Sequence, residues 1–307
     1  MPYYNISDYL DSVKKILNVV QRTNASVIYS NQEHLGPYLS AVKLLSDTTT
    51  VVHIRGQTPP EQAFALQLIL QDRIIFNSQF MCDTTLSEGK IDWLSRSTSH
   101  VVYNAVELPD VSNISPVPEY DNEGITIGMF GRCVPWKNFK FVFDAITDSS
   151  LYSEIGALML VGINSGLGDD KYEAEIKDIA SRRDPQDKFK LIGFQDDIWP
   201  YYMSCDIVVV PSIKEPFGRV PIEAGALGKA VLASNSGGFR ETIQDDETGL
   251  LFELSVEDSF LDKLGELVDD EALRNKLGEQ LKRDVNERFS AERYYDDMAE
   301  ILEVNDD

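Results

Sequence analysis

The sequence has 307 residues, of which 43% are hydrophobic and 10% are aromatic, and this composition excludes a globally disordered chain. The net charge of -23 argues against nucleic-acid binding, because an acidic surface repels phosphate groups. No apolar run reaches the roughly 18–20 residues of a membrane span, and we identify no secretory signal pattern at the N-terminus. We therefore expect a cytoplasmic protein without a transmembrane segment.

The first part of the chain contains short apolar runs separated by helical patterns. The runs are "SVIYS" (26–30), "TVVHI" (50–54), "RIIFN" (73–77) and "HVVYN" (100–104). Helical patterns occur at 9–21, 35–46 and 60–71. Strands that are apolar throughout and alternate with helices indicate a parallel sheet covered on both faces.

Residues 108–124 contain three prolines and no regular hydrophobic period, which is typical of an interdomain linker. The alternation then resumes, with strands predicted at 125–131, 157–162, 188–193, 206–212, 230–234 and 249–253. We therefore expect an α/β protein with two Rossmann-like, doubly wound domains at residues 1–112 and 120–288. Ligands bind beyond the carboxyl ends of the strands in such sheets, so we expect a cleft between the domains.

Several common nucleotide and metal motifs are missing from the sequence. There is no G-x-G-x-x-G after the first strand of either domain and no P-loop, which argues against a dinucleotide dehydrogenase and a P-loop ATPase or GTPase. No D-x-D carboxylate pair occurs, and the three histidines have no zinc-ligand spacing. We expect no metal site and no cofactor. The three cysteines, Cys82, Cys133 and Cys205, are far apart and are expected to be reduced thiols.

Two cations follow the first strand of the second domain. In "GMFGRCVPWKN", Arg132 and Lys137 stand five residues apart across a short turn. Arginine can bind two oxygens of a phosphate in a fork, and lysine acts as a point charge. The pair is placed to hold a diphosphate, although two routine surface cations are the structural alternative.

The stretch "EPFGRVPIE" (215–223) follows another apolar strand and begins a helix. The helix start supplies backbone N–H groups that favour an anion, from Phe217, Gly218, Arg219 and Val220. Glu215 and Glu223 can accept hydrogen bonds from sugar hydroxyls. Complementation of the helix dipole by first-turn acids is the alternative. A further turn, Gly237-Gly238, precedes another short helix whose N–H groups could also face the cleft, and a plain strand–helix connection is the alternative.

These segments together resemble the family 4 retaining glycosyltransferases with the GT-B fold. The resemblance rests on "GRCVPWKN", "LMLVG" and the long stretch from "LIGFQDD" to "ETGLLF", in which Glu215 and Glu223 match the E-x7-E motif. It extends more weakly over nearly the whole chain. The final segment, 289–307, resembles a terminal helix that packs back on the first domain.

The resemblance implies a role for each matching residue. Arg132 and Lys137 would hold the diphosphate and stabilise the leaving group, which can replace a metal. Glu215 would bind a hydroxyl of the donor sugar, and Phe217, Gly218 and Arg219 would add backbone contacts. Glu223 would bind the ribose diol, and Phe194 would lie beside the base.

The sequence departs from the family pattern in the first domain. Family members usually begin with a strand and a glycine-rich loop. The acceptor-side domain of this sequence is therefore reduced, or the sequence is a fragment, or a partner protein or oligomer supplies the missing half. In "VVHIRG", Arg55 stands where the family often has histidine, and His53 is two residues earlier on the same strand face. We expect Arg55 to contact sugar or phosphate, and His53 to be either catalytic or a buried, hydrogen-bonded histidine.

The leading hypothesis is a glycosyltransferase that moves a hexose from a nucleotide-sugar donor to a sugar, glycan, protein or lipid-linked acceptor. The resemblance implies retention of configuration and independence of metal. The alternative is a non-catalytic, nucleotide-sugar-binding subunit of a split or degenerate transferase. A phosphorylase or epimerase of the same fold is a third hypothesis, but a pyridoxal-phosphate enzyme needs a Schiff-base lysine that we do not identify.

Overall fold

The computed structural model describes residues 5–56, 68, 70–88, 98–120 and 124–302. The chain divides into two compact units: unit 1 comprises residues 1–104 and 294–307, and unit 2 comprises residues 105–293. The first segment of unit 1 ends at residue 104, whereas the expected boundary was residue 112. Its second segment begins at residue 294, whereas unit 2 was expected to end at residue 288.

Unit 1 is built on a parallel four-stranded sheet with the order β1-β2-β3-β4. The strands are β1 (Val27–Ser30), β2 (Thr49–Ile54), β3 (Arg73–Phe76) and β4 (Ser99–Val101). All four fall within one residue of the predicted start, so the α/β reading of this part is confirmed. The apolar residues of β2 and β3 are buried because helices cover both faces of the sheet, whereas most residues of β1 and β4 are half-buried.

The helices of unit 1 are α1 (Ile6–Thr23), α2 (Gly36–Leu45) and α4 (Gln79–Glu88), with a short 3-10 turn, η1 (Glu33–Leu35). On one face of the sheet, Leu39 of α2 and Met81 of α4 pack with Val52 and Phe76. On the other face, Met298 of the last helix, α13 (Ala291–Leu302), packs with strand residues. The helix expected at 60–71 lies almost entirely outside the described residues.

Unit 2 is built on a parallel six-stranded sheet with the order β10-β9-β8-β5-β6-β7. The strands are β5 (Ile125–Phe130), β6 (Ile155–Ile163), β7 (Phe189–Gly193), β8 (Ile207–Val210), β9 (Ala230–Ser234) and β10 (Leu250–Phe252). The order reverses between β5 and β8, which is the doubly wound topology that the alternating pattern predicted.

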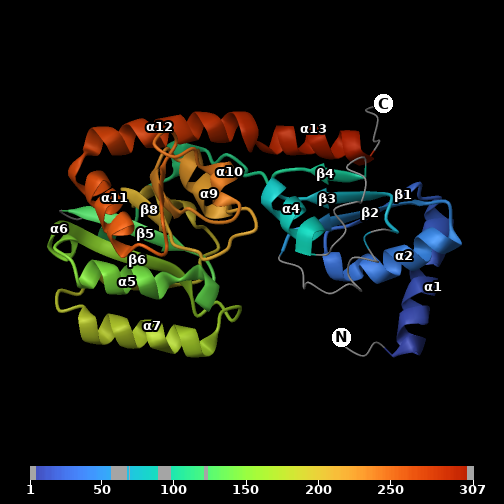
Figure 1. Cartoon of the computed structure of the whole chain (residues 1–307), viewed down its shortest axis with the longest axis horizontal. Helices are drawn as coiled ribbons and strands as arrows, with labels where there is room; N and C mark the ends of the chain where they lie inside the picture. The colour runs from blue at the N-terminus through green and yellow to red at the C-terminus, as the bar shows by residue number, and fades with distance from the viewer. Residues whose placement is uncertain (1–4, 57–67, 69, 89–97, 121–123, 303–307) are drawn as a thin grey trace. The chain divides into compact units, whose positions relative to one another are not determined.

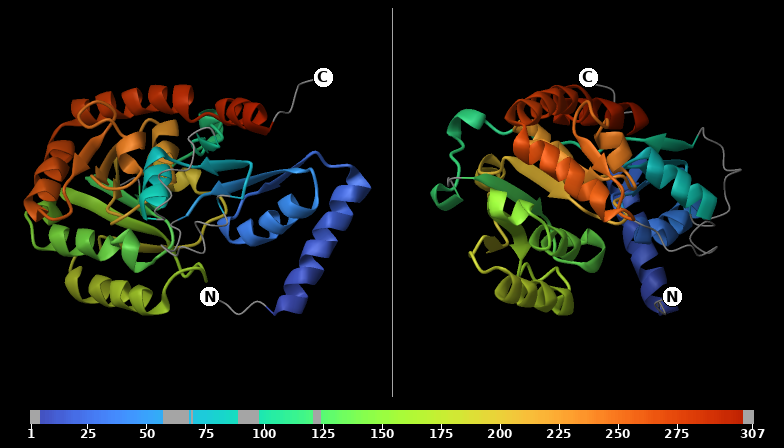
Figure 2. Two further views of the ribbon diagram at one scale, coloured as in Figure 1. Left: turned by 45° about the vertical axis from the view of Figure 1, so that its right-hand side comes forward. Right: turned by 60° about the vertical axis from the view of Figure 1, so that its left-hand side comes forward.

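Helices lie on both faces of the unit 2 sheet (Figures 1 and 2). The helices are α5 (Phe139–Thr147), α6 (Leu151–Glu154), α7 (Asp170–Arg183), α8 (Trp199–Met203), α9 (Arg219–Ala226), α10 (Phe239–Thr242), α11 (Glu257–Asp269) and α12 (Glu271–Arg288). Helices α5, α7 and α11 share one core with the sheet, which includes Phe143, Ile176 and Phe260. Helices α9 and α12 pack together on β9. Gly225 of α9 permits this approach, because an added Cβ would lie 2.6 Å from Leu281 of α12.

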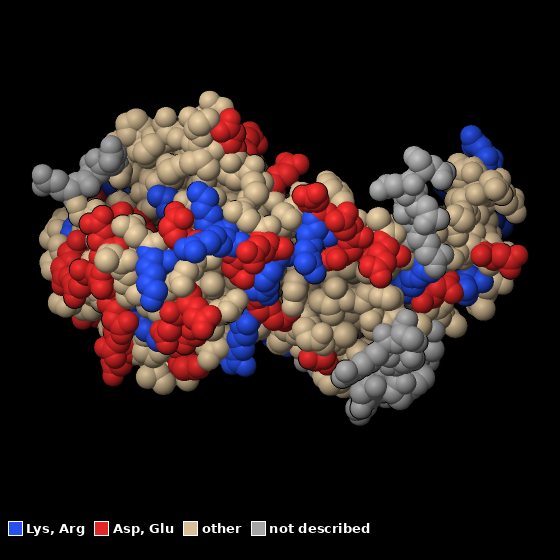
Figure 3. Space-filling model, turned by 90° about the horizontal axis from the view of Figure 1, so that it is seen from above, with Lys and Arg blue, Asp and Glu red and all other residues tan. Residues whose placement is uncertain are grey.

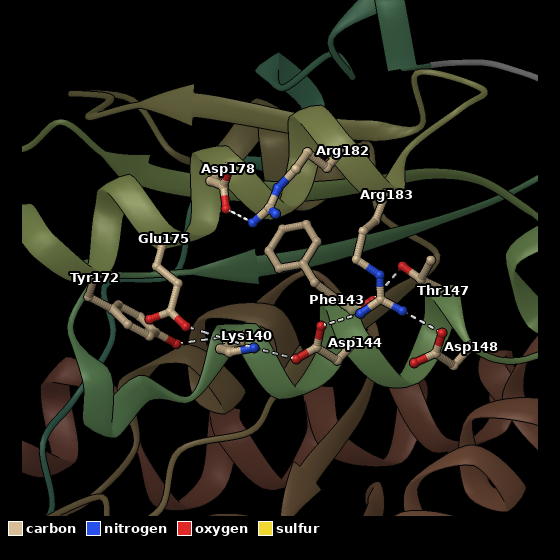
Figure 4. A network of polar contacts seen from close by, with 10 residues as sticks. All are labelled: Lys140, Phe143, Asp144, Thr147, Asp148, Tyr172, Glu175, Asp178, Arg182 and Arg183. Atoms are coloured by element: carbon tan, nitrogen blue, oxygen red, sulfur yellow. Dashed lines mark hydrogen bonds and ion pairs between the residues drawn. The ribbon is translucent and has the colours of Figure 1, made fainter.

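A network of charged side chains joins α5 to α7 (Figure 4). Arg183 binds Asp144 at 2.6 Å and also pairs with Asp148. Lys140 binds Asp144 at 2.7 Å and lies 3.8 Å from Glu175. These side chains are about a third or more exposed, so we expect each pair to contribute little, about 0–1 kcal/mol.

The predicted linker, 108–124, is part of unit 2 as far as the structure describes it. The N–H of Val117 donates to Ser204 Oγ at 2.8 Å, and Tyr120 is buried. Thr126 Oγ1 donates to the carbonyl of Tyr120. The prolines and the missing period were correct signs of irregular structure, but they could not show that the segment packs against unit 2.

The surface seen in Figure 3 includes the solvent-facing sides of α12 and α13. Helix α12 carries five basic and four acidic residues, whereas α13 carries four acidic residues and one arginine. The acidic excess of the chain is therefore unevenly distributed even between consecutive helices. None of the helices in the described part of the chain has the length and apolar character needed to span a membrane.

Candidate functional site

The candidate site lies at the carboxyl ends of β5, β8 and β9 in unit 2. β5 ends at Phe130 and is followed by Gly131, which has φ +126°. A Cβ on Gly162 would lie 2.4 Å from the Gly131 carbonyl oxygen, so the loop after β5 is in close backbone contact with the end of β6. The N–H of Ile213 donates to the carbonyl of Trp136 at 2.9 Å and joins the loops after β5 and β8.

Lys137 and Glu215 meet at this edge, although they are 78 residues apart in the sequence. Lys137 Nζ lies 2.7 Å from Glu215 Oε2. The two side chains are only 11% and 13% exposed, and the ammonium also lies 4.6 Å from the centre of the Trp136 ring. Two residues that sequence reasoning chose separately thus form one largely buried ion pair.

Arg132 differs from Lys137 in its surroundings. It is exposed, and it makes no hydrogen bond or ion pair with any residue that the structure describes. Its guanidinium therefore needs to break no described contact in order to bind an anion. Of the two cations that the sequence grouped together, Lys137 is buried and paired, whereas Arg132 is exposed to solvent.

Helix α9 begins beside Glu215. Gly218 is its N-cap residue, with φ +101° and no side-chain cap. The first turn of a helix leaves its N–H groups without acceptors inside the helix, so the N–H groups of Arg219 and Val220 point out of its start. Pro221 has no N–H and is tolerated at this position. The helix start expected near Gly218 is confirmed, and the helix ends at Ala226, two residues before Gly228.

The loop at Gly237-Gly238 holds this helix start in place. The N–H of Gly238 donates to the Glu215 carbonyl at 2.9 Å. A Cβ on Gly237 would lie 2.3 Å from that carbonyl oxygen, and a Cβ on Gly238 would lie 2.6 Å from Phe217 Cα. Only glycines allow the two loops to approach so closely, and we refer to this contact between residues 215–218 and 237–239 as the glycine lock.

Glu223 lies one turn into α9 and has two partners. The hydroxyl of Tyr202 donates to Oε2 at 2.8 Å, and Arg219 pairs with Oε1 at 3.0 Å. Tyr202 is fully buried and stacks on Phe130, with ring centres 3.8 Å apart. Burial and the nearby Glu223 carboxylate raise the pKa of Tyr202, so its hydroxyl stays a hydrogen-bond donor. Glu223 is held in one orientation with its side chain still 17% exposed.

Two aromatic residues predicted for the site have different environments. Phe194 directly follows β7 and is 62% exposed. Phe217 is 1% exposed, and its ring lies against Phe289, with centres 5.7 Å apart. Phe217 can therefore offer a ligand only its backbone, which is the contribution that the sequence predicted.

The remaining predicted residues lie in unit 1. His53 is wholly buried in β2, and its Nδ1 lies 2.7 Å from the hydroxyl of Tyr29. Burial, with the positive charge of Arg55 nearby, lowers the pKa of His53 to about 3, so the imidazole is neutral at physiological pH. The geometry favours the buried, hydrogen-bonded alternative for His53 over contact with a ligand.

Arg55 directly follows β2 and is held by neutral side chains. Its Nη1 donates to Asn31 Oδ1 at 3.1 Å, and its Nη2 donates to Asn104 Oδ1. Asn77 donates to the Arg55 carbonyl at 3.0 Å, and Asn77 Oδ1 is buried without a partner among the described residues. Among the described residues the guanidinium has amide partners and no carboxylate, so none of them neutralises its charge.

Sequence reasoning missed Tyr202 and the three asparagines. Tyr202 stands in "IWPYYM", where nothing distinguishes it from Tyr201. Asn31, Asn77 and Asn104 each stand shortly after a strand of one parallel sheet, and this shared position was a usable signal.

Comparison with protein families decides which group of proteins the chain belongs to. The model described as glycosyl transferases group 1 matches residues 110–284, more than half of the chain. The chain is a group 1 glycosyltransferase. The matched region contains the whole unit 2 sheet and both glutamates of "EPFGRVPIE".

Individual relatives agree with this assignment. An uncharacterised glycosyltransferase of Methanocaldococcus jannaschii, MJ1178, is 25% identical over 309 residues, covering 98% of this chain and 82% of that protein. The predicted resemblance to glycosyltransferases, and the prediction of an enzyme, are confirmed.

Solved structures confirm the GT-B fold of this group 1 glycosyltransferase. A glycosyltransferase from Rickettsia africae ESF-5 superposes with a TM-score of 0.85 at 20% identity, covering 99% of this chain and 83% of that chain. Anabaena Alr3699/HepE, solved in complex with UDP-glucose, gives a TM-score of 0.81 at 21% identity, covering 95% and 82% of the two chains.

Proposed function

We propose that the protein transfers a hexose from a nucleoside-diphosphate sugar to an acceptor that is a sugar, a glycan, a protein or a lipid-linked sugar. The observation that carries this proposal is the Lys137–Glu215 pair beside the uncapped start of α9. A cation and free N–H groups suit a diphosphate, and the carboxylate suits a sugar hydroxyl. UDP-glucose, the ligand of the Anabaena neighbour, is the first donor to test.

On this proposal the donor diphosphate is bound by Lys137, Arg132 and the backbone N–H groups of Gly218, Arg219 and Val220. As the glycosidic bond breaks, negative charge grows on the leaving nucleoside diphosphate. Lys137 and Arg132 stabilise that charge, so no divalent metal and no other cofactor is needed.

The two carboxylates bind hydroxyl groups. Lys137 occupies Oε2 of Glu215 and leaves Oε1, which has no partner among the described residues, to accept a bond from the donor sugar. Glu223 accepts the ribose hydroxyls through the lone pairs that Tyr202 and Arg219 do not use. Phe194 offers an exposed ring for stacking against the base.

Further parts of the proposal concern stereochemistry, unit 1 and location. We propose retention of anomeric configuration, on the resemblance to family 4 enzymes. Arg55 contributes its guanidinium to sugar or phosphate binding, whereas His53 has no exposed surface with which to do so. Unit 1 binds the acceptor, and the enzyme acts in the cytoplasm.

Release of nucleoside diphosphate from a panel of donors, with and without sugar acceptors, tests the proposal. We expect Lys137→Ala, Glu215→Ala and Arg132→Ala each to lower turnover at least tenfold, about 1.4 kcal/mol or more in activation free energy. Lys140→Ala is the matched control, because Lys140 binds Asp144 on α5 and should leave turnover unchanged.

Two results would contradict parts of this proposal. Unchanged turnover in all three site variants would refute the site assignment, and tight donor binding without turnover on any acceptor would instead favour a binding subunit. Activity should persist in excess EDTA. Loss of activity there, restored by Mg²⁺ or Mn²⁺, would refute metal independence.

A further inference from the structure

Helix α1 has an apolar face that unit 1 covers only in part. Ile6, Leu10, Val13 and Val20 follow a helical spacing that brings them to one side. Val13 and Val20 are 4% and 8% exposed, whereas Ile6 and Leu10 are 75% and 49% exposed. The face is therefore packed at Val13 and Val20 and uncovered at Ile6 and Leu10, near the start of the helix.

An apolar hollow of about 440 Å³ lies beside the second half of α1. Its lining includes Ile16, Val19, Val20, Ala25, Val27 and Ile28. A second hollow of about 360 Å³ adjoins it through Ile16 and Ile28. Both lie along β1, which is the edge strand of the sheet and pairs only with β2 among the described strands.

The charges of α1 are divided between its two halves. The first half, residues 6–14, carries Asp8, Asp11 and Lys14 and has a net charge of -1, whereas the second half, residues 15–23, carries only Lys15 and Arg22 and has a net charge of +2. If two copies of the helix lie antiparallel, the acidic half of each faces the basic half of the other. The uncovered apolar residues of each copy then face the hollow of the other copy.

We propose that the protein forms a two-fold symmetric dimer through α1 and the adjoining hollows. Ile6 and Leu10 of one copy insert into the hollow lined by Val19, Val27 and Ile28 of the second copy. A two-fold axis requires a patch that complements itself, and this patch pairs uncovered apolar residues with an apolar hollow and acidic with basic side chains. Helix α1 has 18 residues and is therefore about 27 Å long, which is long enough for each of its halves to contact the opposite half of α1 in the second copy.

The distribution of charge also favours this surface over others. Residues 1–120 carry 8 basic and 12 acidic residues, whereas residues 121–307 carry 20 basic and 39 acidic residues. Self-association through the second region would bring together two strongly acidic surfaces. An anionic membrane is a poorer occupant, because α1 carries acids of its own and not a uniformly basic polar face.

Sedimentation velocity and light scattering of the full chain test the proposal. Over about 1–100 µM, a range that brackets weak self-association, we expect a rise from the mass of one chain toward twice that mass. Ile6→Glu and Leu10→Glu should each weaken the dimer at least tenfold. Val256→Glu is the matched control, because Val256 is also 49% exposed but lies in unit 2.

A charge exchange tests the antiparallel arrangement. Asp8→Lys with Asp11→Lys should weaken the dimer, because cations then face Lys15 and Arg22 of the second copy. Adding Lys15→Glu and Arg22→Glu should restore it. All of these side chains are exposed, so circular dichroism and melting temperature should be unchanged.

Three results would overturn the proposal. The first is a single-chain mass at every concentration. The second is a dimer that Leu10→Glu leaves intact, which would require a different surface. The third is a chain that is monomeric in solution but binds phosphatidylglycerol vesicles through α1, which would assign the apolar face to a membrane.

Discussion

Replacing Glu215 by glutamine tests the ion pair and the proposed donor site together. The substitution keeps the size of the side chain and an acceptor oxygen, but it removes the negative charge beside Lys137. Lys137 would then be an almost buried cation without a counterion. We expect the free protein to lose stability and the site to become more attractive to an anion.

The magnitude follows from the geometry of the pair. At the Nζ–Oε2 distance of 2.7 Å, two unit charges attract by about 6 kcal/mol at an effective dielectric constant of about 20. Desolvation offsets much of this attraction, and removing one partner of a buried pair costs about 3–5 kcal/mol. Because the amide oxygen can still accept a hydrogen bond, we expect Glu215→Gln to lower the free energy of unfolding by about 2–3 kcal/mol.

Urea unfolding with and without UDP measures both effects. UDP restores negative charge beside Lys137, so it should bind the variant about tenfold more tightly, adding about 1.4 kcal/mol to its stability. Turnover of the nucleotide sugar should nevertheless fall. Glu175→Gln is the control, since Glu175 lies 3.8 Å from Lys140 in an exposed pair. A stability loss under about 0.5 kcal/mol in Glu215→Gln, with unchanged UDP affinity, would refute the reasoning.

Three further changes test other parts of the structure. Tyr202→Phe removes a hydrogen bond to the charged Glu223 and should cost about 1.5–3 kcal/mol in urea unfolding. It should also weaken nucleotide binding in calorimetry, and unchanged binding would limit Tyr202 to a role in stability. His53 has a lower pKa in the folded than in the unfolded state, so the unfolded chain binds the extra proton and stability falls as pH drops from about 6.5 toward 3. At pH 5 the free energy of unfolding should be lower by about 2 kcal/mol, and His53→Gln should abolish this loss. If the free energy of unfolding depends on pH equally in both proteins, His53 is not a buried, neutral histidine. Gly218→Ala places a Cβ 2.6 Å from the Phe239 ring at φ +101° and should lower stability by at least about 2 kcal/mol, so an unchanged melting temperature would be evidence against this contact.

The sheets could be predicted because their strands are nearly continuous apolar runs. A segment such as "DIVVVPS" has few alternatives to a buried parallel strand, and its carboxyl end shows where a ligand could bind. Helix α4 (Gln79–Glu88) escaped prediction because "QFMCDTTLSE" has no apolar face with helical period. The packing of the proline-containing segment on unit 2 depends on Ser204 and on the burial of Tyr120, which no local pattern reveals.

The residues of the candidate site could be predicted from the sequence, but the contacts between them could not. Residue type and position after strand ends identified Lys137 and Glu215 as candidates, because ligands bind beyond the carboxyl ends of parallel strands. The ion pair between the two side chains depends on the tertiary structure, so the sequence could not reveal it. The hydrogen bond from Tyr202 to Glu223 was hidden for a similar reason. A tyrosine in an aromatic helix is ordinarily a core residue, and only its contact with Glu223 distinguishes Tyr202 from such a residue.

The glycine lock has a consequence for engineering this enzyme. Residues 215–217 and 237–238 touch through main-chain atoms, and Gly218 lies against the Phe239 ring, so neither loop can accept an insertion or a bulkier residue without displacing the other. Grafting one of these loops alone from a relative would therefore misplace the start of α9. The two loops should be transplanted as one cassette, together with the Phe217–Phe289 packing beneath them.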